Sequence, residues 1–115
     1  MQRTDPRVQQ EVQRFIRLLV DGDYAAAERV TSSKRLSALE IQTAILDYGR
    51  PLVAPPDHAW ALMSAIRVRD ADMPTWSVVM PLWTKEEGRS DLSIELTITL
   101  RGDRVVMTCD DIHVL

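Results

Sequence analysis

The segment Leu92–Leu100 constrains the fold of this chain more than any other feature of its sequence. It reads Leu-Ser-Ile-Glu-Leu-Thr-Ile-Thr-Leu, so aliphatic and polar residues alternate without a break. Successive side chains of a β-strand point to opposite faces, and this alternation therefore gives one aliphatic face and one polar face. The segment predicts a strand that buries one face in a core and leaves the other face polar.

Further strands and short connections around this segment predict an antiparallel sheet. Runs of β-branched and aromatic residues indicate strands at Thr75–Trp83 and Val105–Cys109, and Ile112–Leu115 either extends the last strand or forms its own short edge. Arg101–Arg104 is short enough for a hairpin turn with Gly102 and Asp103 at its centre. Lys85–Asp91 predicts a longer, charged connection.

Two parts of the predicted β region leave alternatives open. Pro81 has no backbone N–H to donate, so its strand is expected to lie at an edge or to carry a bulge. The segment Trp60–Arg69 is strand-like, but its alanine-rich beginning could equally form a helical turn before Ile66 and Val68.

The first part of the chain has the periodicity and the capping residues of helices. Asp5-Pro6 predicts a helix start, and apolar residues at intervals of three to four continue this helix to about Val20. After Asp21-Gly22-Asp23, a short helix is expected over Tyr24–Val30 and a polar break over Thr31–Lys34. A third helix is expected from the capping box Ser37–Glu40 to Gly49.

These elements predict an α+β fold, with two to three N-terminal helices packed on a curved antiparallel sheet of about four strands. We expect a single domain over residues 1–115, with a helical part at about 5–49, a proline-containing connector at 50–58 and a β part at about 59–115. The order of elements resembles the cystatin-like and nuclear-transport-factor-two-like (NTF2-like) cone folds, in which a curved sheet wraps a long first helix.

Composition narrows the classes of partner and the compartment. The longest apolar runs are interrupted by polar residues, so no membrane span is expected, and the polar N-terminus has no export signal. The net charge is −3 and the basic residues are scattered, which argues against nucleic-acid binding. Cys109 is the only cysteine, so no internal disulfide can form. We therefore expect a cytoplasmic protein.

Several short motifs are similar to an uncharacterised family of short bacterial proteins known as a domain of unknown function. The similarity extends upstream through Tyr48-Gly49-Arg50 and implies a bacterial, stand-alone domain, but no activity, cofactor or catalytic residue. The motifs are Thr75–Val78, Leu82–Thr84, Glu86–Leu92, Glu95-Leu96 and Asp111–Leu115.

Candidates for chemistry are few. Cys109, Asp111 and His113 would point to one side of an ideal strand and offer metal-ligand atoms, but their spacing matches no recognised metal motif. We therefore predict no metal, no cofactor and no catalytic residue. Cys109 alternates with apolar residues and is expected to be a small buried hydrophobic side chain, and His58 is expected to be a loop histidine.

The charged Lys85–Asp91 loop and the end of the chain are the predicted partner-binding regions, because loops on a rigid sheet often carry binding residues and because Trp and Arg are favoured anchors at interfaces. The residues concerned are Trp83, Glu86, Glu87, Arg89, Asp91, Asp111 and His113.

Three functional hypotheses follow from this distribution of residues. The first is a non-enzymatic protein-binding or accessory module, for example of the immunity type, acting through surface loops and the sheet face. The second is a small-ligand-binding protein or enzyme in which Tyr24, Tyr48, Trp60 and Trp76 line an opening between helices and sheet, and His113 or an Asp supplies polarity. The third is a structural homodimer formed through the polar sheet face.

Overall fold

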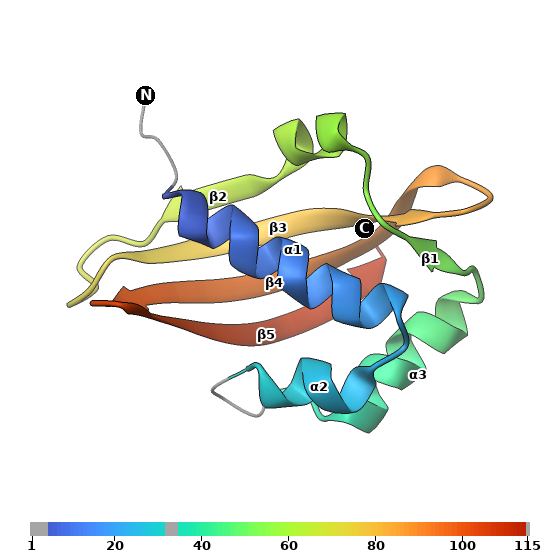
Figure 1. Ribbon diagram of the computed structural model, residues 1–115, viewed down its shortest axis with the longest axis horizontal. Helices are drawn as coiled ribbons and strands as arrows, with labels where there is room; N and C mark the ends of the chain where they lie inside the picture. Colours follow the sequence, from blue (N-terminus) through green and yellow to red (C-terminus); the bar gives the residue numbers. More distant parts are fainter. Residues whose placement is uncertain (1–4, 32–34, 115) are drawn as a thin grey trace.

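The computed structural model describes residues 5–31 and 35–114 and confirms the predicted α+β class (Figure 1). Three helices precede an antiparallel sheet of five strands, one more than predicted, because two residues of the connector pair with the sheet. The elements in chain order are α1 (Pro6–Val20), α2 (Tyr24–Arg29), α3 (Ala38–Tyr48), β1 (Leu52–Val53), the 3₁₀ helix η1 (Asp57–Leu62), β2 (Ser64–Arg67), β3 (Thr75–Thr84), β4 (Gly88–Arg101) and β5 (Arg104–Val114).

The helix ends follow the predicted capping chemistry. The Asp5 carboxylate accepts a hydrogen bond from the Arg7 backbone N–H at 2.9 Å and caps α1. Ser37 and Glu40 form the reciprocal capping box of α3. Gly49 ends that helix at φ +79°, a left-handed conformation that glycine adopts without strain. Of the predicted polar break, residues 32–34 lie outside the described part of the chain.

The strand order is β1-β3-β4-β5, and β2 pairs with β3 on the same side as β1. β3 changes its register with β4 between Pro81 and Trp83, which confirms the bulge predicted for Pro81. The β2 pairing ends at Val79 and the β1 pairing begins at Trp83, so Pro81 lies in the gap between these two strands. A residue without an N–H is tolerated there because no neighbouring strand requires its hydrogen bond.

The structure corrects one predicted boundary and resolves two alternatives that the sequence left open. The predicted long connection at Lys85–Asp91 is wrong, since β4 already begins at Gly88 and only Lys85–Glu87 connect the strands. The ambiguous segment Trp60–Arg69 combines both alternatives, as η1 ends at Leu62 and β2 follows. The chain end extends β5 through Val114, and Leu115 lies outside the described residues.

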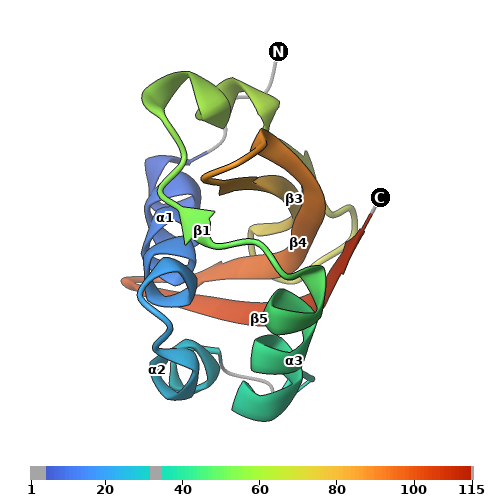
Figure 2. The ribbon, with the colours of Figure 1, turned by 90° about the vertical axis from the view of Figure 1, so that its right-hand side faces the viewer.

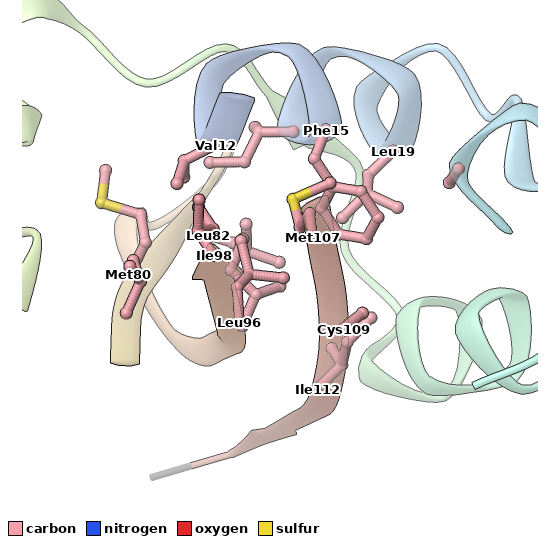
Figure 3. Packing of buried hydrophobic residues seen from close by; sticks show 14 of the residues in the cluster. Val12, Phe15, Leu19, Met80, Leu82, Leu96, Ile98, Met107, Cys109 and Ile112 are labelled. Atoms are coloured by element: carbon pink, nitrogen blue, oxygen red, sulfur yellow. The ribbon is translucent and has the colours of Figure 1, made fainter. Parts of the chain in front are cut away.

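The core lies between α1 and the concave face of the sheet. Figure 2 shows the curved sheet with α1 on its concave side and with α2 and α3 below the edge formed by β5. Val12, Phe15 and Leu19 of α1 point toward side chains of β3, β4 and β5 (Figure 3). The predicted aliphatic face of Leu92–Leu100 is confirmed, because its five aliphatic side chains are all buried. Within the described ranges, no helix is long and apolar enough to span a membrane.

Candidate functional site

The face of the sheet opposite α1 is called the outer face below, and no helix packs across its centre (Figure 2). At its β5 end, α3 borders grooves together with Asp111 and His113. Residues directly opposite each other in an antiparallel ladder lie on the same face, so the strand registers define its rows. One row crosses four strands as Ile66, Ser77, Thr97 and Thr108, and a second as Ser64, Val79, Glu95 and Asp111. A third row contains Pro81, Ser93 and His113.

The centre of the outer face has short, uncharged side chains. The first row brings Ile66, which is 66% exposed, beside the hydroxyl groups of Ser77 and Thr97. Val68, just after β2, is 39% exposed and extends this apolar part. A surface of small side chains with an exposed aliphatic group can be covered by another surface at little cost in side-chain entropy.

Charge on the outer face is concentrated where β4 pairs with β5. Here the residues Glu95, Asp111 and His113, called the acid–histidine cluster below, bring their ligand atoms within 4.8 Å of one another. His113 Nδ1 lies 3.3 Å from Glu95 Oε2 and 3.1 Å from Asp111 Oδ2. These three side chains are the group that could hold a metal ion among the described residues.

A β-bulge at Asp110 creates this cluster. The register shifts between the pairs Leu96–Cys109 and Glu95–Asp111, so Asp110 is the extra residue of β5. The expectation that Cys109, Asp111 and His113 share one side is therefore wrong. Cys109 points into the core, whereas Asp111 and His113 lie on the outer face beside Glu95 of the neighbouring strand.

Burial explains the state of the Cys109 thiol. Its side chain lies among core residues, and this burial, together with the charge of Asp110, raises the pKa of Cys109 to about 12. The prediction that Cys109 is a small buried hydrophobic side chain is confirmed. A thiol with this pKa is a poor nucleophile and a poor metal ligand at neutral pH.

Asp110 itself adds a further carboxylate at the free edge of β5. Its Oδ2 accepts a hydrogen bond of 2.6 Å from the Thr97 hydroxyl on the outer face. Its Oδ1 lies 3.7 Å from Nε of Arg35, an ion pair at the surface. Together with Glu95 and Asp111, it makes this end of the outer face acidic.

The residues predicted around the charged loop have different surroundings. Glu86, Glu87, Arg89 and Asp91 are all exposed, but Glu87 also makes contacts outside the turn. The Glu87 carboxylate accepts hydrogen bonds from the Tyr48 hydroxyl at 2.8 Å and from the Thr84 hydroxyl at 3.0 Å. Desolvation and the hydrogen bond to Glu87 raise the pKa of Tyr48. Glu87 therefore ties the β3–β4 turn to α3.

Trp83, predicted as an anchor beside this loop, is only 8% exposed and belongs to the core. Its ring meets the His58 ring edge-on, with the centroids 6.4 Å apart. His58 lies in η1 rather than in a loop, and its side chain is exposed. Neither residue contributes to the outer face or to the acid–histidine cluster.

The four aromatic residues expected to line one opening lie in different surface grooves. Tyr24 lines a groove of about 370 Å³ at the end of α1, and Trp60 lines one of about 280 Å³ beside the same helix. Trp76 and Tyr48 border further grooves of about 680 Å³ and about 310 Å³. The space between α1 and the sheet is filled by side chains (Figure 3).

Two members of this surface were missed as site residues by reasoning from the sequence. Glu95 and Ser93 were expected only to belong to the polar face of the Leu92–Leu100 strand. The alternation of Leu92–Leu100 places both on the polar face, but the register with β5 is needed to bring them to Asp111 and His113.

The fold and this surface define a small α+β domain with one uncovered sheet face. A family model described as "Domain of unknown function (DUF7668)" matches residues 16–115, and the chain belongs to this family. The matched range contains all the motifs on which the resemblance was based, so the resemblance to a domain of unknown function is confirmed. No curated protein and no solved structure matches the chain.

Proposed function

We infer that this domain is a non-enzymatic protein-binding module and that its contact surface is the outer face of the sheet. The observation that carries this proposal is the packing of α1 on the opposite face, which leaves the centre of the outer face open with Ile66 exposed beside the Ser77–Thr97–Thr108 row. The filled interior and the buried, neutral Cys109 thiol support binding at the surface over chemistry inside the domain.

The distribution of charge and apolar groups specifies the partner. Ile66 and Val68 form the apolar part of the surface on the β2 side, and Glu95 and Asp111 form the acidic part on the β5 side. A protein with an apolar patch next to lysine or arginine side chains would complement both parts. The partner is thus a second protein with a basic surface.

A capture experiment with matched variants tests this proposal. The immobilised domain is exposed to lysate of the native host, and each enriched protein is then purified and titrated against the domain by calorimetry. Ile66→Arg and Thr97→Arg place a long cation on the outer face, where a basic partner would be repelled. Leu46→Arg on α3 is the control, because Leu46 is 61% exposed and lines a groove with Leu19 of α1 rather than with outer-face residues.

We expect the purified partner to bind the wild type and Leu46→Arg equally. Both outer-face variants should weaken binding at least tenfold, which corresponds to about 1.4 kcal/mol. The proposal is wrong if no protein is enriched or if the outer-face variants bind like the wild type. It is also wrong if the captured protein is the chain itself, in which case sedimentation would show a dimer that Thr97→Arg dissociates.

A further inference from the structure

We propose that the acid–histidine cluster binds a divalent transition-metal ion such as Zn²⁺, with His113, Glu95 and Asp111 as ligands. This site goes beyond the proposed protein-binding function and does not depend on it. It also departs from the sequence-based prediction, which found no metal motif, because one of the ligands comes from a different strand.

The distances between the ligand atoms support a shared ion. Two ligands at about 2.1 Å from a metal are about 3.0 Å apart at a right angle and about 3.4 Å apart at a tetrahedral angle. His113 Nδ1 lies 3.1 Å from Asp111 Oδ2 and 3.3 Å from Glu95 Oε2, which is within this range. All three donor atoms lie within 4.8 Å of one another, so rotation of the two carboxylate side chains can bring them to one ion.

The position of His113 Nδ1 between two carboxylates suits a shared cation as well as an ion pair of the protonated imidazole. This nitrogen is itself shielded from solvent and makes no hydrogen bond within the described part of the chain, although two carboxylates lie near it. A buried polar atom without a partner is unfavourable, and a bound cation would satisfy it. The second such side-chain atom is Ser93 Oγ, whose residue is fully buried and lies directly opposite His113 in the ladder.

The surrounding sheet orients two of these groups. Asp111 Oδ1 accepts a hydrogen bond of 2.9 Å from the Ile112 backbone N–H, which leaves Oδ2 for the ion. Three protein ligands leave a coordination position for water, and such a water would give Ser93 Oγ a partner. The ligands lie on two paired strands, and this makes the site more rigid than one built on a loop.

The ligand types select the class of ion. One imidazole nitrogen with two carboxylates suits zinc and neighbouring transition metals, whereas magnesium and calcium prefer sites made only of oxygen. The side chains of His113, Glu95 and Asp111 are 31%, 41% and 54% exposed, so an ion can reach the site from solvent. Cys109 cannot compete for zinc, since it points into the core on the other side of β5.

The two histidines of the chain provide a matched test. Untagged full-length protein is titrated with ZnCl₂ by calorimetry, and His113→Ala is compared with His58→Ala and Glu95→Gln. We expect one Zn²⁺ per wild-type chain, unchanged affinity in His58→Ala, and at least tenfold weaker binding in His113→Ala and Glu95→Gln. Zinc should also raise the melting temperature of the wild type and His58→Ala but not that of His113→Ala.

Circular dichroism without metal shows whether the variants are folded, and Glu95→Gln keeps the test decisive if His113→Ala does not fold. The proposal is overturned if the wild type binds no zinc, or if folded His113→Ala or Glu95→Gln binds zinc like the wild type. Equal loss of binding in His58→Ala would overturn it as well.

Discussion

Glu86 and Glu87 are adjacent in the sequence, but only Glu87 makes side-chain contacts with described residues distant in sequence. Both residues are exposed in the β3–β4 turn, but Glu87 also accepts hydrogen bonds from Tyr48 and Thr84 and pairs with Arg50 at 3.8 Å. Glu87 therefore joins the hairpin to the end of α3, although both residues have the same chemistry. At the scale of single residues, contacts with residues distant in sequence decide which of the two glutamates stabilises the fold.

Replacing Glu87 should consequently destabilise the domain more than replacing its neighbour. We expect Glu87→Ala to lower the free energy of unfolding by about 1–2 kcal/mol, because hydroxyl groups of two residues lose their acceptor. Glu86→Ala is the matched control and should change it by less than about 0.5 kcal/mol. Urea denaturation measures both values, and equal effects would show that the hydrogen bonds of Glu87 do not contribute.

The buried thiol makes a second prediction at this scale. With a pKa of about 12 instead of the ordinary 9.0, the Cys109 thiolate is about 1,000-fold less populated at pH 8 than that of a free cysteine. Native protein should therefore hardly react with a thiol reagent at pH 8, whereas protein in denaturant should react with one equivalent of the reagent per chain. Rapid labelling of the native protein would contradict the burial of Cys109.

The same shift affects stability at high pH. Because the pKa of Cys109 in the folded state lies above its ordinary value, the folded state keeps this proton longer than the unfolded state. The contribution of Cys109 to stability is fully present below about pH 9 and is lost as the pH rises toward 12.

At the scale of elements, β4 shows which interactions carry the fold. Leu96 is fully buried at the centre of the aliphatic face, where it lies opposite Val78 and Cys109. We expect Leu96→Ala to lower the free energy of unfolding by about 2–5 kcal/mol, since it leaves a cavity in the core. Leu46→Ala on the surface of α3 is the control and should cost less than about 0.5 kcal/mol. Similar losses in both variants would contradict the assignment of the core.

The elements themselves were largely predictable from local patterns. The capping residues Asp5, Ser37 and Gly49 act at the predicted helix ends, and the alternation of Leu92–Leu100 defines the buried face of β4. These features depend on residues close in sequence, where helical and strand periodicities operate.

The acid–histidine cluster was not predictable in this way. A single extra residue, Asp110, changes which face of β5 the following side chains occupy, and no local signal marks it in the sequence. The cluster also depends on the pairing of Glu95 with Asp111, which is a contact between strands. The positions of the four aromatic side chains also depend on contacts between segments distant in sequence. For this reason the four residues were wrongly expected to line one opening.

At the scale of the whole molecule, the position of the helices separates a filled side from an open side. α1 packs against the concave face, and the outer face keeps both its exposed aliphatic group and its acidic end (Figure 2). The bacterial origin and the likeness to cone folds remain predictions from the sequence. The central claim is that the outer face is the binding surface.

Methyl chemical-shift mapping of the labelled domain with its purified partner tests this claim most directly. The methyl groups of Ile66, Val79 and Thr97 on the outer face should shift, whereas those of Leu46 on α3 should keep their positions. Leu46 is 61% exposed and lines a groove with Leu19 and Gly49, so it would report an interface on the helical side of the domain. Shifts at Leu46 without shifts on the outer face would contradict the claim.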